Sequence, residues 1–264
     1  MKLCVNLQGF MKMKNRLHFR SKGQGKPIVL LHGYLENLTM WTEFANELAK
    51  NYQVVAIDLP GHGESEVDAA THTMEFMAEK VVEVLEALNL QKSMFVGHSM
   101  GGYVVLALAE LFPEKVASFV LMNASTLADD AEKKALRLRM VAMVDRNFDL
   151  LVKLSFSGLF HDTQRFHLEK ETMQAMALST EIEGVKAALQ GMRLRKDRSF
   201  VLDEFSGEIG IIHGEFDTII DVKAFEKVLP KKENISVLTV LSGHLSFIEA
   251  AETTLKFIQK MAEK

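Results

Sequence analysis

The segment Gly97-His98-Ser99-Met100-Gly101 constrains the fold of this chain more than any other feature. It lies between an apolar stretch at residues 93–96 and a helix that we expect to begin near Gly102. Glycines two positions before and two positions after a serine let a strand and a helix approach closely across a sharp turn. The segment therefore predicts a nucleophilic serine, Ser99, at the end of a strand, where helix N–H groups favour negative charge. The alternative is a structural turn in which the serine is incidental.

Short apolar stretches on both sides of this turn alternate with amphipathic stretches, which is typical of a parallel sheet with crossover helices. We expect buried strands at residues 28–31, 54–57, 94–96, 119–121, 209–212 and 237–241. One expected helix presents a buried face of Met77, Val81, Val84, Leu85 and Leu88. Ser246 and Glu249 have the spacing of a capping box at the start of a C-terminal helix. The pattern predicts an α/β fold with a mostly parallel central sheet flanked by helices.

The middle of the chain differs from both flanks. No proline lies between Pro113 and Pro230, and residues 127–206 have long helical patterning. The 13 basic and 13 acidic residues of this segment cancel, which favours a solvated outer face. We expect a helical cap or lid at 127–206, inserted into a core formed by 14–126 and 207–264. Residues 1–13 are either an N-terminal extension or a first strand.

Composition excludes several classes of function. The net charge of −4 over 264 residues is too mild, and of the wrong sign, for a nucleic-acid surface or a polybasic membrane anchor. The single cysteine, Cys4, allows no internal disulfide and no cysteine zinc site. The longest apolar run, residues 103–109, is too short to span a membrane. With no secretory signal and no metal or dinucleotide motif, we expect a cytoplasmic protein without a cofactor; its oligomeric state stays open.

A serine hydroxyl needs a base within hydrogen-bond distance, and that base is oriented by a carboxylate. In a sheet of this class both partners follow the serine in the chain, the acid before the histidine. The histidines beyond Ser99 are His161, His167, His213 and His244. His161 and His167 fall in the expected insert, whereas His244 follows the last expected strand and a glycine. We therefore expect His244 to be the base.

The acid is expected in the turn that follows the strand at 209–212. Asp217 is the preferred candidate, and Glu215 and Asp221 are its rivals because they lie close by. The end of the strand at 119–121 is another possible place for the acid, but it carries Asn123, which has no negative charge. The role of Asp217 would be to fix the tautomer of His244 and to stabilise its imidazolium form.

Acyl transfer builds an oxyanion that backbone N–H groups must bind. One donor comes from the residue after the nucleophile, which is Met100. The other comes from the loop after an early strand, where His32-Gly33-Tyr34 points to the N–H of Tyr34.

These segments together resemble the α/β-hydrolase superfamily, and within it the small bacterial serine esterases and related hydrolases with a lid. The resemblance covers residues 14–264 and also includes the motif at residues 58–65, Gly214 with Asp217, and Gly243-His244. It implies Ser99 as nucleophile, Asp217 as acid and His244 as base. It also implies that 58–65 is a structural loop, so Asp58 and His62 are given no chemical role. Epoxide hydrolases and haloalkane dehalogenases of this superfamily have an aspartate where Ser99 stands, so those activities are disfavoured.

We therefore expect a serine hydrolase that cleaves a carboxylic ester of a small or apolar acyl substrate through an acyl-enzyme. A lactonase, thioesterase, carbon–carbon bond hydrolase or perhydrolase would use the same triad, and a slow-turnover ligand receptor would retain it. The apolar side chains of the insert suit either an acyl pocket or ordinary core packing, and the core is favoured. These side chains are Met140, Met143, Phe148, Phe156, Phe160, Phe166, Met173 and Met176. Trp41 suits the core and the wall of a pocket equally.

Overall fold

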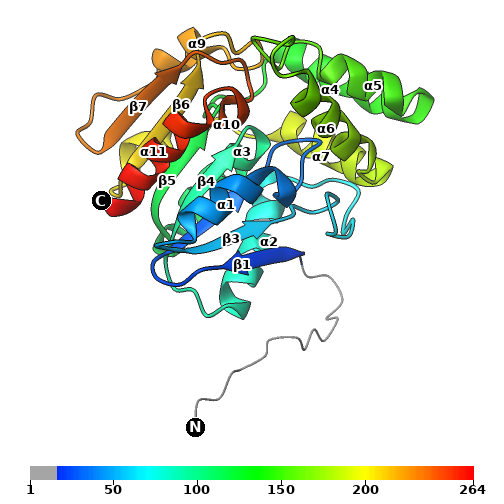
Figure 1. The fold of residues 1–264 in the computed structure, drawn as a ribbon. Helices are drawn as coiled ribbons and strands as arrows, with labels where there is room; N and C mark the ends of the chain where they lie inside the picture. The colour runs from blue at the N-terminus through cyan, green and yellow to red at the C-terminus, as the bar shows by residue number, and fades with distance from the viewer. Residues whose placement is uncertain (1–16) are drawn as a thin grey trace.

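A seven-stranded sheet lies at the centre of the computed structural model, which describes residues 17–264 (Figure 1). The strand order is β1-β3-β2-β4-β5-β6-β7, and every pair is parallel except β1 with β3. The strands are β1 (Phe19–Lys22), β2 (Pro27–Leu31), β3 (Gln53–Ile57), β4 (Ser93–His98), β5 (Val116–Met122), β6 (Ile209–Gly214) and β7 (Ile235–Val240). The predicted α/β fold with a mostly parallel sheet is confirmed. The prediction for residues 1–13, and Cys4, lie outside the described residues.

The last strand differs from its prediction as a buried strand. Among residues 17–264, β7 pairs only with β6 and so lies at the edge of the sheet. Val237 is 48% exposed, and Leu241, which follows the strand, is 71% exposed. The prediction of burial is wrong because an apolar run does not distinguish an edge strand from a central one. β1 at the opposite edge was not predicted, since its four residues, Phe-Arg-Ser-Lys, have no apolar run.

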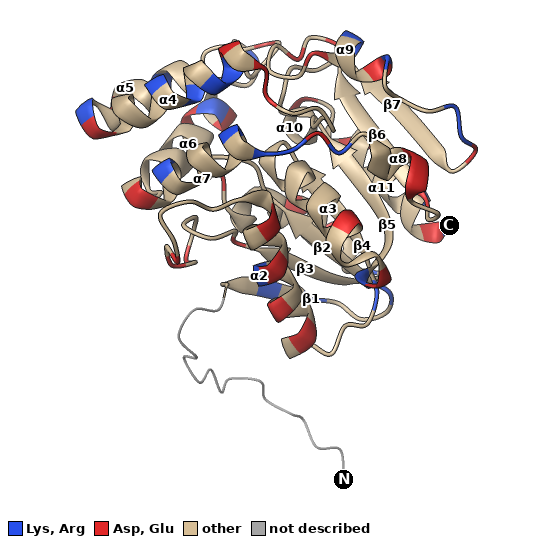
Figure 2. Ribbon diagram, turned by 180° about the vertical axis from the view of Figure 1, so that it is seen from behind, with Lys and Arg blue, Asp and Glu red and all other residues tan. Residues whose placement is uncertain are grey.

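Helices cover both faces of the sheet. α1 (Thr42–Leu48) and α11 (Ala251–Glu263) lie on one face (Figure 1), and α2 (Met74–Ala87), α3 (Met100–Leu111) and the short α8 (Phe200–Glu204) lie on the other (Figure 2). In α2 the expected face is buried from Met77 to Leu85, while Leu88 caps the helix and is partly buried. Trp41, at the end of the 3₁₀ turn Leu38–Trp41, is a core residue, with its ring 5.8 Å from those of both Phe44 and Phe247. Among residues 17–264, no helix combines the length and apolar character needed to cross a membrane.

The chain between β5 and β6 contains helices and no strand. These are α4 (Ala131–Arg146), α5 (Phe148–Ser155), α6 (His167–Leu178), α7 (Ile182–Leu194) and α8, and the first four gather at one end of the sheet (Figure 1). Acidic and basic side chains are mixed along them (Figure 2). Phe156, Phe160 and Met173 are buried in the hydrophobic core, and the other apolar residues singled out above pack against it, as in ordinary core packing.

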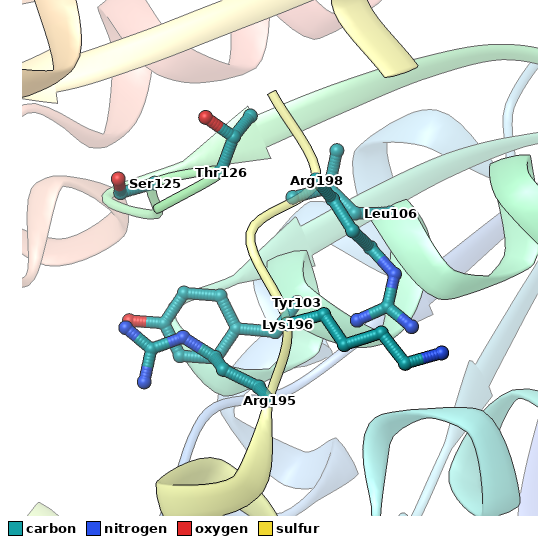
Figure 3. Close-up of a pocket in the computed structure, with 7 residues that line it drawn as sticks. All are labelled: Tyr103, Leu106, Ser125, Thr126, Arg195, Lys196 and Arg198. Carbon is teal, nitrogen blue, oxygen red and sulfur yellow. The ribbon is translucent and has the colours of Figure 1, made fainter. Parts of the chain in front are cut away.

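Two arginines join the end of this helical segment to the core. Arg198 is buried and pairs with Glu75 of α2 at 2.6 Å and with Glu110 of α3 at 2.8 Å. The Arg195 guanidinium pairs with Asp129 and lies 4.2 Å from the centre of the Tyr103 ring. A shallow depression lies beside them, lined by Tyr103, Leu106, Ser125, Thr126 and Lys196 together with the two arginines (Figure 3). Because the arginines are already paired, we interpret this surface as an anchor for the helices and not as an anion site.

The start of α3 packs against the end of β2 with no room for a side chain. A Cβ atom on Gly101 would lie 2.4 Å from the Leu31 carbonyl oxygen and 2.7 Å from that of His32. We expect Gly101→Ala to lower the free energy of unfolding by about 1–3 kcal/mol, because the added methyl group displaces backbone. Chemical denaturation of the purified variant measures this loss. An unchanged midpoint would show that α3 can move away from β2 freely.

Candidate active site

Ser99 occupies the turn between β4 and α3 in an uncommon backbone conformation, with φ of 48° and ψ of −113°. Its N–H donates to the Met122 carbonyl at 3.0 Å, and its own carbonyl accepts the N–H of Gly102 at 3.0 Å. A Cβ atom on Gly97 would lie 2.5 Å from the Gly101 backbone, so this position requires glycine. The structure thus contains the predicted strand-turn-helix arrangement, and the helix begins at Met100, two residues before Gly102.

His244 lies between β7 and α10 (Ser246–Glu249), and its Nε2 is 2.9 Å from the Ser99 Oγ. The N–H of His244 donates to the Leu159 carbonyl at 2.7 Å, which holds the loop. The structure places the other three candidate histidines differently. His161 stacks on Phe216, the Nδ1 of His167 contacts the Gln164 carbonyl, and His213 packs edge-on against Phe225.

Asp217 lies on the far side of the His244 ring, with 2.8 Å between its Oδ2 and the Nδ1 of His244. Its Oδ1 accepts the backbone N–H groups of Ile219 and Ile220 at 2.8 and 3.1 Å. Of the rival acids, Asp221 accepts the Ala224 N–H at the start of α9 (Val222–Glu226), and Glu215 is exposed. Asp217 is the acid that the structure brings to His244.

Asp217 is ionised in this environment. Burial by itself would raise the pKa of the carboxyl, but the charge and hydrogen bond of His244, with the hydrogen bonds of Asn123 and Ile220, lower it well below its usual value. Because a carboxylate only accepts hydrogen bonds, the Nδ1–H of His244 is the donor. The Nε2 lone pair therefore faces the Ser99 hydroxyl, which is the tautomer that a general base needs.

Asn123 is a site residue that sequence reasoning missed. It follows β5 with φ of 48°, a conformation that asparagine adopts more readily than most residues. Its Nδ2 donates to Asp217 at 3.0 Å and to the Gly243 carbonyl at 3.2 Å, and its Oδ1 accepts the Ser246 hydroxyl at 2.5 Å. Asn123 thereby ties the loop of the acid to the loop of the base. The sequence signal for Asn123 is its position at the end of a strand.

The capping box predicted for Ser246 and Glu249 is wrong. α10 has no side-chain cap, because Ser246 donates to Asn123 and Glu249 accepts the N–H of Gly243 at 2.6 Å. Glu249 also accepts the backbone N–H groups of His161 and Asp162, at 2.9 and 3.0 Å. Its carboxylate therefore joins the loop of His244 to the helical segment between β5 and β6.

The two predicted oxyanion donors come from segments that touch. Met100 is the first residue of α3, so its N–H has no acceptor within the helix. The close approach at Gly101 brings this helix end against the end of β2, and Tyr34 follows two residues after His32. Burial raises the pKa of the Tyr34 hydroxyl, with Arg137 opposing, so the side chain stays neutral.

Asp58 and His62, which were given no chemical role, hold the surrounding loops. Asp58 accepts the N–H groups of Leu38 and Glu64 at 2.7 and 3.0 Å. Burial, followed by the neighbouring His32, lowers the pKa of His62 to about 3, so this ring is neutral at physiological pH. Within residues 17–264 no group of three or more His, Cys, Asp or Glu side chains is placed to hold a metal ion.

Known proteins resemble this chain over most of its length. The dihydrolipoyllysine-residue acetyltransferase component of the acetoin cleaving system of Pseudomonas putida is 32% identical over 248 residues, which are 89% of this chain and 64% of that protein. The chain thus spans less than two thirds of that relative.

Solved structures of other proteins have the same fold as this chain over nearly its whole length. An esterase from Thermogutta terrifontis is 31% identical, with a TM-score of 0.87 over 94% of this chain and 93% of the other. An enol-lactonase from Burkholderia xenovorans LB400 has the same fold at 20% identity, with a TM-score of 0.84 over 94% and 96% of the two chains. The sequence profile described as the alpha/beta hydrolase fold matches residues 26–251. The chain therefore belongs to the alpha/beta hydrolase family.

Proposed function

We propose that this protein is a serine hydrolase that cleaves the carboxylic ester of a small or apolar acyl substrate. The observation that carries this proposal is the continuous hydrogen-bonded arrangement of Ser99, His244 and Asp217, with distances of 2.9 and 2.8 Å. The 31% identity to an esterase supports an ester as the substrate.

The first half of the proposed cycle forms an acyl-enzyme. The Nε2 of His244 removes the Ser99 proton while the Oγ attacks the ester carbonyl. The N–H groups of Tyr34 and Met100 bind the oxyanion that develops. When the tetrahedral intermediate collapses, the imidazolium of His244 returns the proton to the departing alcohol, and Asp217 stabilises that imidazolium throughout.

The second half returns Ser99 to its free form. A water molecule gives a proton to the Nε2 of His244 and attacks the acyl carbonyl, and the same N–H groups bind the second oxyanion. Collapse releases the carboxylic acid, and the imidazolium proton goes back to the Ser99 Oγ. Every proton in the cycle passes through His244, and none of the proposed steps uses a cofactor.

The same triad could also act on lactones or thioesters, and turnover rates on each substrate class distinguish these activities. A lactone differs from an ester only in that the departing alcohol stays tethered, and a thioester only in its leaving group. We propose esters first because the structure at 31% identity is an esterase, whereas the lactonase shares 20% identity and supports the fold alone. A slow receptor would form the acyl-enzyme and release it slowly.

Replacing the nucleophile tests the proposal. We expect Ser99→Ala to lower kcat for p-nitrophenyl acetate by at least about 10⁴-fold, because the attacking oxygen is lost. The wild-type protein is measured in parallel on p-nitrophenyl esters of increasing chain length, on γ-lactones and on thioesters. Higher kcat/KM for the esters supports the proposal. Full hydrolysis by Ser99→Ala, or preference for another substrate class, contradicts it.

The acid is tested with a matched pair of variants. We expect Asp217→Asn to lower kcat by about 10⁴-fold, because an amide no longer stabilises the imidazolium and favours the wrong tautomer of His244. Asp221→Asn keeps an oxygen that accepts the Ala224 N–H, so its kcat should stay within about twofold of wild type. Equal losses in both variants would exclude Asp217 as the acid. Steady-state kinetics on p-nitrophenyl acetate give both numbers.

A further inference from the structure

A second pair of an acidic residue and a histidine lies buried beside the triad. The Glu36 Oε2 is 2.9 Å from the His98 Nδ1, and the two side chains are only 4% and 1% exposed. Glu36 lies in the loop after β2, and His98 is the last residue of β4, directly before Ser99. The proposed catalytic cycle makes no use of either side chain.

Both ring nitrogens of His98 face oxygen acceptors. The Nδ1 faces the Glu36 carboxylate, and the Nε2 is 3.0 Å from the carbonyl oxygen of His244. Burial opposes ionisation of Glu36, but the neighbouring His98 and the Gly33 N–H lower the pKa of its carboxyl, so it is ionised. A neutral imidazole has only one N–H, so the contacts with this carboxylate and with the carbonyl together require the imidazolium form. Burial by itself would lower the pKa of His98, but the charge and hydrogen bond of Glu36, with the His244 carbonyl, raise it. His98 and Glu36 thus form a buried ion pair.

The pair contacts each of the three segments proposed to carry the chemistry. Glu36 accepts the Gly33 N–H at 2.5 Å, which holds the peptide next to the Tyr34 N–H. His98 adjoins Ser99 in the chain and donates to the backbone of His244, with 5.1 Å between the two rings. One ion pair therefore links the oxyanion loop, the nucleophile and the base.

Gly33 packs so tightly against Glu36 and His98 that there is no room for a side chain at this position. A Cβ atom there would lie 2.6 Å from the Glu36 Oε2 and 2.9 Å from the His98 Nδ1. Because the carboxylate and the ring lie directly beside this residue, we expect a change in either side chain to shift the backbone that presents the Tyr34 N–H. A backbone N–H stabilises an oxyanion only when it lies at hydrogen-bond distance from it, so a displacement of about 1 Å would weaken catalysis.

We propose that Glu36 and His98 are positioning residues for acyl transfer, which hold the Tyr34 N–H and the base His244 in register with Ser99. This inference rests on the proposed function. Neither residue is assigned a contact with substrate, so both act through their neighbours. A pair that served folding alone would have no need to contact all three segments. The ion pair of Arg198 with Glu110, which lies at the base of the helical segment, contacts none of them.

The experiment compares two replacements of Glu36 on p-nitrophenyl acetate. Glu36→Gln keeps an oxygen for the Gly33 N–H but removes the charge that holds His98 as an imidazolium. Glu36→Ala removes both. We expect kcat to fall about 10-fold in Glu36→Gln and about 100-fold in Glu36→Ala, with KM within about twofold, since the affected donors act in the transition state. Rates are divided by the number of sites that a fluorophosphonate labels, so misfolded protein does not count.

Glu110→Gln is the control, because it removes a carboxylate from a separate and only partly buried ion pair, and its kcat per labelled site should match wild type. A graded loss of kcat confined to the Glu36 variants supports the proposal. Wild-type kcat in the Glu36 variants, or a loss seen only in KM or in the labelled fraction, overturns it and leaves a structural role. If Glu36→Ala does not fold, Glu36→Gln decides by the same criteria. A wild-type protein that neither turns over the ester nor reacts with the label contradicts the proposed function itself.

Discussion

The strained turn at Ser99 is the constraint on which the rest of the site depends. Its backbone is held at positive φ between β4 and α3, and these two elements approach so closely that Gly97 has no room for a Cβ atom. Gly101 has no room for one either, because the start of α3 also packs against the end of β2. One turn therefore determines where the serine oxygen lies, where the first N–H groups of α3 lie, and which loop can present a second donor.

The parallel sheet brings the remaining groups to that turn. Carboxyl ends of parallel strands meet at one edge, so the loops after β2, β5, β6 and β7 can supply Tyr34, Asn123, Asp217 and His244 although these are far apart in the chain. Buried polar contacts then lock the loops together. Asn123 joins the loop of Asp217 to that of His244, Glu249 joins the loop of His244 to the helical segment, and Glu36 with His98 joins it to the loop after β2. Each of these contacts replaces hydration with a fixed partner, which favours a single arrangement of the loops.

The central strands, and the three residues that the structure brings together as the proposed triad, could be predicted from the sequence because each has a local signal. The strands are short apolar runs, and Ser99, Asp217 and His244 each follow a strand beside a glycine or in a turn. The exposure of β7 has no such signal, since it depends on which strand ends the sheet. The spacing of Ser246 and Glu249 predicts a capping box, but in the structure both side chains bind residues outside their own helix. The spacing of two residues does not distinguish local partners from distant ones. The Glu36–His98 pair joins residues 62 apart, and no periodicity or motif spacing reports a contact of that kind.

The most direct test of the central claim is the mass of the protein after reaction with a fluorophosphonate, followed by peptide mapping. The account predicts one adduct per chain, located on Ser99, and almost none in His244→Ala, because the hydroxyl is a weak nucleophile without its base. A wild-type protein that stays unmodified, or an adduct on another residue, would contradict the assignment of Ser99 as an activated nucleophile.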